Sequence, residues 1–181
     1  MLQVGQTAPS FSAKPVFGYR VELPESVNEK PMVLCFFPSL ESAVSRESVA
    51  KMQERFADFD RLGVKVVGIT PSSLRSTQDF APRYHVLFPL ISDENSDIAT
   101  KFGVEKLSRS SIISSLTPNG LASGVNALSF GTGLPKTGML QASAEFVIAK
   151  GGEIAYARIG TSLWDSIEIE PLLEAVKCSL D

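Results

Sequence analysis

A continuous apolar stretch followed by a helical pattern constrains the fold of this chain more than any other feature. The stretch runs from Met32 to Phe37 and contains only hydrophobic residues, which is typical of a strand buried on both faces of a sheet. From Ser42 to Leu62 large apolar residues recur at helical spacing, and Gly63 suits the residue that follows a helix end. A second apolar run, from Val64 to Ile69, comes next. The pattern predicts a strand–helix–strand unit.

Further strands and helices are predicted around that unit. They comprise a hairpin over residues 16–23, a helix over 71–84, a strand over 88–91, a helix ending at 102, a hairpin of 144–149 and 153–159, and a helix over 165–178. Strand–helix units followed by a hairpin and a helix favour an α/β fold with a central mixed sheet covered by helices.

Composition excludes several classes of protein. A chain of 181 residues with 44% hydrophobic content fits one domain with a core of ordinary size. The net charge is −3 and Lys and Arg form no cluster, so neither nucleic acid nor a membrane surface is an expected partner. We expect no signal peptide and no membrane span, because the N-terminus lacks the charge pattern and no long apolar stretch occurs. Two cysteines are too few for a disulfide framework, so we expect a cytoplasmic protein.

The junction between the first buried strand and its helix reads PSLESAVS, residues 38–45. It resembles the Pro-x-x-x-Thr/Ser-x-x-Cys signature of the alkyl hydroperoxide reductase C / thiol-specific antioxidant family, the peroxiredoxins. Pro38 and Ser42 match, and Ser45 stands at the place of the peroxidatic cysteine. Other segments are similar to the family in order and spacing: VGQTAPSF at 4–11, VGIT at 67–70, FPLISD at 88–93, FGV at 102–104 and FVI with GGEI at 146–154. The resemblance implies one thioredoxin-like domain of peroxiredoxin type over residues 1–181.

Two departures from the family pattern affect the chemistry that the resemblance implies. A thiolate is the nucleophile in that chemistry, and Ser45 has no counterpart of the sulfenic acid that the thiolate forms. The family's arginine, three residues before the hairpin phenylalanine, is replaced by Ser143. An engineered cysteine-to-serine change would explain Ser45 but not Ser143, so natural loss of activity is favoured. Arg46, Arg109 or Arg158 could supply a guanidinium from elsewhere.

Other chemical interpretations have less support. Serine hydrolysis would have to recruit His85, the only histidine, and no Gly-x-Ser-x-Gly turn is present. Cys35 lies in the apolar strand, where an inert thiol is expected rather than a substitute nucleophile. Cys178 lies in the last helix and is expected to be structural or incidental rather than a resolving cysteine. No Cys-x-x-Cys occurs and metal-ligand spacings are missing, so we expect neither a metal nor a cofactor.

Residues 110–135 contain no charged residue and eight large apolar ones. Because the family makes a shorter connection here, the segment resembles an insertion at about 108–139. Long loops in compact domains are functional or disordered. One hypothesis is a surface loop packed by its own side chains. The other is that the apolar residues cover the pocket at Ser45 or contact a second subunit or a protein partner. The resemblance implies a homodimer.

Three functional hypotheses remain. The first is a peroxiredoxin-like binding or assembly module in which Pro38, Ser42, Ser45 and Ser143 form a vestigial pocket. The second is a thiol-dependent peroxidase whose cysteine at position 45 was mutated to serine. The third is another enzyme that uses the same pocket, because a fold alone does not determine function. The natural codon at position 45 would separate the first two.

Overall fold

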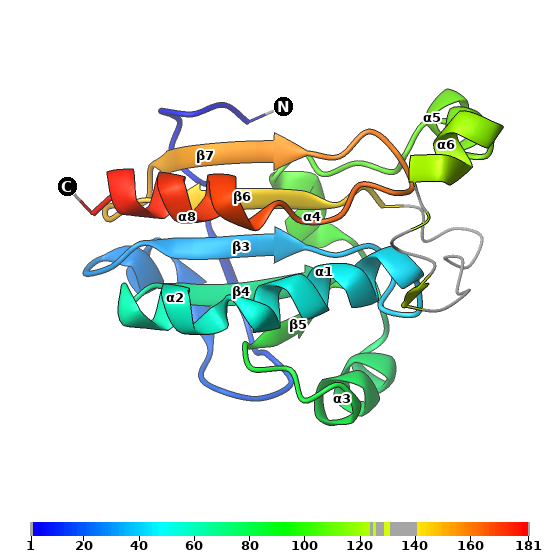
Figure 1. The fold of residues 1–181 in the computed structure, drawn as a ribbon. Helices are drawn as coiled ribbons and strands as arrows, with labels where there is room; N and C mark the ends of the chain where they lie inside the picture. Colours follow the sequence, from blue (N-terminus) through cyan, green and yellow to red (C-terminus); the bar gives the residue numbers. More distant parts are fainter. Residues whose placement is uncertain (1, 124, 126–128, 131–140, 181) are drawn as a thin grey trace.

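The fold is built on one five-stranded mixed sheet (Figure 1). The structure is a computed structural model that describes residues 2–123, 125, 129–130 and 141–180. The strands, in the order β5-β4-β3-β6-β7 across the sheet, are Leu90–Ser92, Lys65–Thr70, Met32–Phe36, Ala144–Ile148 and Ile154–Ile159. Strand β3 runs parallel to β4 and antiparallel to β6, and β5 runs parallel to β4. The predicted α/β fold with a mixed sheet is confirmed.

Helices cover both faces of the sheet (Figure 1). The face that α1 covers also carries α2, α3 and α8, whose bounds are Ala43–Glu54, Phe56–Arg61, Leu74–Arg83 and Ile169–Cys178. The opposite face packs against α4 and the small β1–β2 hairpin, with bounds Asp97–Lys101, Phe11–Ala13 and Val21–Leu23. A short 3-10 helix spans Glu25–Val27. Helices α5 and α6, Arg109–Ser115 and Pro118–Ser123, lie at the end of the molecule where α1 begins.

Strand β3 separates the two hydrophobic cores. Val33 and Cys35 face the α1 side, whereas Leu34 and Phe36 face the α4 side. All five residues of β3 are buried, as the continuous apolar run predicted. On the α4 side the ring of Phe146 lies 5.7 Å from that of Phe36, centre to centre, which places large aromatic area in the core.

Several predicted boundaries were wrong for local reasons. The N-terminal hairpin pairs β1 with β2 rather than folding within 16–23, because the Val16 N–H donates to the Leu90 carbonyl at the edge of β5. The long first helix is interrupted at Arg55, whose backbone is not helical, and therefore forms α1 and α2. The last helix begins at Ile169 instead of 165, because the Asp165 carboxylate accepts two backbone N–H groups in a preceding turn.

The uncharged segment, residues 110–135, contains more helix than its sequence pattern suggested, since α5 and α6 occupy its first half. The prediction that its apolar side chains pack over the pocket is wrong for the five that are 42–67% exposed, which are Ile113, Leu116, Leu121, Val125 and Phe130. Leu128 and Leu134 lie outside the described residues. Contact with a second subunit stays a prediction. No helix among the described residues is both long and apolar enough to cross a membrane.

Candidate functional site at the start of helix α1

The loop after β3 places Ser45 in the first turn of α1. Ser42 is the N-cap residue, with an extended backbone (φ −76°, ψ 149°), and its Oγ accepts the Ser45 backbone N–H at 3.1 Å. This is the usual way in which serine satisfies an unpaired donor at a helix start. Ser45 itself is fully buried. The local sequence therefore holds the Ser45 hydroxyl in the buried first turn of α1.

A network of hydroxyl groups encloses Ser45. Ser42 Oγ donates to Ser45 Oγ at 2.9 Å, and Ser45 Oγ donates to the Pro38 carbonyl at 3.2 Å. Thr70, at the end of β4, donates to the same carbonyl at 3.1 Å, while Ser72 Oγ accepts the Leu40 N–H at 3.0 Å. Every one of these groups is neutral. A serine needs a paired base to become a nucleophile, and none of these contacts supplies one.

Ser143 lies at the same end of the sheet. It precedes β6, whose Ala144 pairs with Phe36, so its backbone is next to the loop that carries Pro38. Its Oγ donates to the Asp165 carbonyl at 2.7 Å. A Cβ at Gly160 would lie 2.6 Å from this oxygen, so the hydroxyl is tightly enclosed. Within the described residues no hydrogen bond joins Ser143 to Ser45.

Two of the three candidate replacement arginines, Arg46 and Arg158, are engaged elsewhere. Arg46 donates through Nε to the Phe130 carbonyl at 2.7 Å and through a terminal nitrogen to the Glu41 carbonyl at 2.9 Å. Arg158 pairs with Glu145 at 2.8 Å and with Glu168 at 3.0 Å. The side chain of Arg109 lies outside the described part of the structure. Neither Arg46 nor Arg158 donates a hydrogen bond to the Ser45 hydroxyl.

Cys35 and Glu145, both fully buried, form a row with the partly exposed Arg158 across β3, β6 and β7. Burial, and then the Glu145 carboxylate, raise the pKa of the Cys35 thiol well above its ordinary value. A thiol held neutral in this way is a poor nucleophile, which agrees with the expected inert role. Cys178 ends α8 at the opposite end of the sheet from the start of α1 (Figure 1). Both cysteines are free.

His85 does not join the hydroxyl network. It follows α3 with a positive φ of 49° and lines a separate cavity, described below. Serine hydrolysis at Ser45 with His85 as base therefore has no structural support. Among the described residues, no group of three or more His, Cys, Asp and Glu side chains is placed to hold a metal ion.

A clamp formed by Ser115 and Trp164 covers the first turn of α1. Trp164 packs against Ala43 and Val44, the two residues between the cap and Ser45. The Trp164 indole N–H donates to the Ser115 carbonyl at 2.7 Å, and the Leu163 N–H donates to Ser115 Oγ at 3.1 Å. The end of α5 therefore fixes the turn that closes over the start of α1.

Comparison with known proteins shows the family to which the chain belongs. The sequence profile of the AhpC/TSA family matches residues 4–157. The chain belongs to the AhpC/TSA family. Chloroplastic peroxiredoxin Q of Sedum lineare is 32% identical over 100 residues, which cover 55% of this chain and 53% of that protein. A putative peroxiredoxin bcp of Coxiella burnetii is 26% identical over 103 residues, or 57% of this chain and 68% of that one. The alignments thus span about half the length of the plant relatives.

Solved structures show the same fold at low sequence identity. Peroxidoxin BcpB of Mycobacterium tuberculosis superposes with a TM-score of 0.72 at 18% identity, covering 98% of each chain. A cysteine-to-serine mutant of peroxiredoxin 6 of Arenicola marina gives a TM-score of 0.72 at 16% identity, covering 98% of this chain and 73% of that one. The predicted thioredoxin-like fold of peroxiredoxin type is confirmed.

Sequence reasoning about this AhpC/TSA protein missed three residues at the site. The first turn of α1 is covered by Trp164 and Ser115, and the buried charge nearby belongs to Glu145. None of the three lies in the motif at residues 38–45. Trp164 is the only tryptophan, which was an available signal. Glu145 interrupts an otherwise apolar strand, and a buried carboxylate of this kind needs a partner. Nothing in the sequence distinguished Ser115, because five of the eight residues from 108 to 115 are serine.

We expect Ser115→Ala to loosen the clamp. Loss of the contacts to Leu163 and Ser162 should lower the free energy of unfolding by about 1–2 kcal/mol. Trp164 should also become more accessible to acrylamide, which its fluorescence measures directly because it is the sole tryptophan. Ser114→Ala is the matched control, since within the described residues that hydroxyl donates to the Ser111 carbonyl of its own helix. Equal quenching in both variants would contradict the clamp.

Proposed function

We propose that this AhpC/TSA protein, with serine at positions 45 and 143, does not reduce hydroperoxides by thiol chemistry and acts through binding or assembly. The single observation that carries the proposal is the enclosure of the buried Ser45 hydroxyl between Ser42 and Pro38, where its partners among the described residues are a hydroxyl and a carbonyl. Family membership supports a site of peroxidase ancestry, and the hydroxyl network supports a loss of its reactivity.

The missing step can be stated in atoms. In thiol-dependent reduction the thiolate sulfur attacks one peroxide oxygen, the O–O bond breaks, and a sulfenic acid and an alcohol or water are formed. A dithiol then returns the sulfenic acid to the thiol. The Ser45 hydroxyl provides neither the polarisable sulfur nor the reversible oxidation, and the buried Cys35 thiol is held neutral.

We predict that the protein consumes hydrogen peroxide no faster than buffer when a dithiol reductant is supplied. Stopped-flow measurement of peroxide loss tests this directly. Cys35→Ser is the control that detects a substitute nucleophile. Turnover well above buffer that disappears in Cys35→Ser would overturn the proposal.

A thiol peroxidase with cysteine at position 45 is the second candidate. The family supports it, as does the position of residue 45 in the first helical turn, where the helix dipole and the Ser42 hydroxyl would stabilise a thiolate. Ser45→Cys should nevertheless be slow, because Arg46 and Arg158 are engaged elsewhere. Adding Ser143→Arg should help more than either change alone. A fast Ser45→Cys single variant would favour this candidate over the first.

Assembly and compartment belong to the same proposal. The exposed apolar side chains of Ile113, Leu116 and Phe130 support contact with a second copy or with a protein partner. Two free cysteines are compatible with a reducing cytoplasm. Sedimentation equilibrium decides between a monomer and the proposed homodimer.

A further inference from the structure

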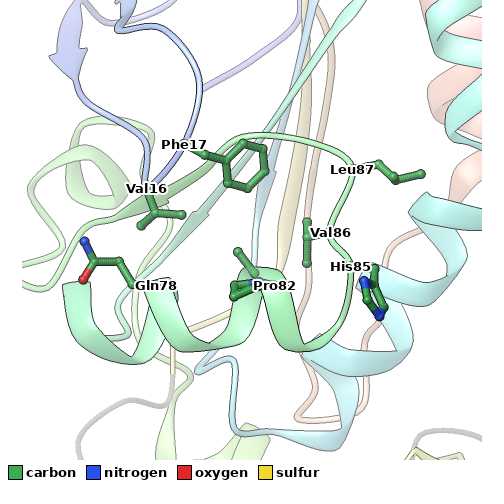
Figure 2. Close-up of a pocket in the computed structure, with 8 residues that line it drawn as sticks. Val16, Phe17, Gln78, Pro82, His85, Val86 and Leu87 are labelled. Atoms are coloured by element: carbon green, nitrogen blue, oxygen red, sulfur yellow. The ribbon is translucent and has the colours of Figure 1, made fainter.

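A cavity of about 500 Å³ lies beside α3, apart from the hydroxyl network at Ser45 (Figure 2). Phe17 faces α3 from the loop between β1 and β2, while Val86 and Leu87 come from the connection between α3 and β5. Among the lining residues that follow α3, Gln78 lies at one end and His85 at the other. The cavity shares no lining residue with the candidate site.

Backbone contacts hold the walls of this cavity in place. The Val16 N–H donates to the Leu90 carbonyl at 2.8 Å, which ties the segment bearing Phe17 to the edge of β5. On the other side the Val86 N–H donates to the Ala81 carbonyl at 2.9 Å and fixes the chain reversal at His85. The walls are therefore held by the backbone of the fold itself, which lowers the ordering cost of binding.

The lining has a distinct chemical character. None of the eight residues that line the cavity is Asp, Glu, Lys or Arg. Ala81 and Val86 form a buried apolar floor, whereas Phe17 and Leu87 are 39% and 54% exposed. Within the described residues, the side chains of Gln78 and His85 make no hydrogen bond, so their polar atoms are available to a bound molecule.

We propose that this cavity binds a small uncharged molecule that has an aromatic ring and a hydrogen-bonding substituent. Its volume lies in the range of small-molecule sites, which combine apolar walls with a few polar groups. The exposed Phe17 ring offers a surface for offset stacking, and Gln78 can both donate and accept a hydrogen bond. A charged ligand is disfavoured, because entering the apolar cavity would remove its hydration without an ion-pair partner.

Titration with benzamide, followed by ¹H–¹⁵N NMR at about pH 7.5, tests the proposal. Benzamide has one aromatic ring and one neutral group that donates and accepts. We expect saturable shifts at Gln78, His85 and Leu87, and a rise in Kd of about tenfold in Phe17→Ala, from lost stacking and contact area. Leu74→Ala is the control, because Leu74, at the start of α3, is an exposed apolar residue like Phe17 but does not line the cavity. Its Kd should equal that of the wild type.

Two analogues separate the contributions to binding. Benzoate has a similar shape but carries a charge, and should bind at least about tenfold more weakly than benzamide. Cyclohexanecarboxamide keeps the amide without the aromatic ring and should also bind more weakly. Shifts that fail to saturate, a Kd unaffected by Phe17→Ala, or equal binding of benzoate would each overturn the proposal. So would a dimer, seen by sedimentation equilibrium, that Phe17→Ala dissociates and benzamide does not affect, because a second copy would then cover this face.

Discussion

The free energy of unfolding of the wild-type protein is expected to fall by about 3 kcal/mol, through Glu145 alone, as the pH rises from about 5 to about 8. Glu145→Gln is expected to remove that fall. Urea unfolding at several pH values across this range measures both slopes. The side chain of Glu145 is fully buried, which makes the charged form costly.

The sign follows from the direction of the pKa shift. Burial raises the pKa of Glu145 to about 7, and the attraction of Arg158 only partly offsets it. In the unfolded chain the pKa is about 4.3. The folded protein therefore binds the proton more tightly, so the stabilisation is complete below about pH 4.3 and is lost as the pH rises through about 7. Other groups around the carboxylate are the Cys35 thiol, the Tyr156 hydroxyl and Glu168, whose N–H donates to it at 3.2 Å.

Two further variants test the cause. Glu170→Gln removes an exposed carboxylate that pairs with Arg55, and the pH slope should stay as in the wild type. Arg158→Met removes the cation beside Glu145, so the decline should become larger and extend to higher pH. If the wild type and Glu145→Gln show the same slope, the buried carboxylate is not the group responsible.

The pairing of Glu145 with Arg158 shows where sequence patterns fall short. The hairpin across Gly151 and Gly152 was predictable from its two strand patterns. However, a register continued from Ile148 opposite Ile154 would place Glu145 opposite Ala157, with Arg158 on the other face. An irregularity between Val147 and Ile148 shifts the register by one residue and brings the two charges together. No local residue pattern predicts this shift in strand register.

The candidate site was predictable to a different extent. The run 32–37 and the helical pattern after Ser42 located the strand-to-helix junction, because both are local signals. The prediction that Ser143 lies at the same end of the sheet as Ser45 came from the family resemblance. The antiparallel pairing of Ala144 with Phe36 gives the physical reason, because it places Ser143 beside the loop that leads to Ser45. The contact between Trp164 and Ala43 joins segments far apart in the chain, and it depends on Ser115 in a segment whose pattern suggested only a loop.

Gly68→Val is expected to lower the free energy of unfolding by about 3 kcal/mol, although valine is ordinarily favoured over glycine in a strand by up to about 1 kcal/mol. Gly68 lies in β4 between Cys35 of β3 and Leu90 of β5. A Cβ here would lie 2.5 Å from Leu90 Cδ2 and 2.6 Å from Phe37 Cε2. Both neighbours are fully buried, so neither can move into solvent. Lys65→Val is the control in the same strand, since Lys65 is exposed and the change should be nearly neutral.

A double-mutant cycle separates this steric clash from a general intolerance of the strand. If the clash with Leu90 is the cause, Gly68→Ala should cost less in a Leu90→Ala background than in the wild type, because the space that Leu90 vacates admits the new methyl group. Relief should be incomplete, since Phe37 still limits the same space. Denaturant unfolding of the four proteins gives the interaction energy. Strictly additive costs would mean that Gly68 is required by the β4 backbone rather than by the packing of Leu90 against it.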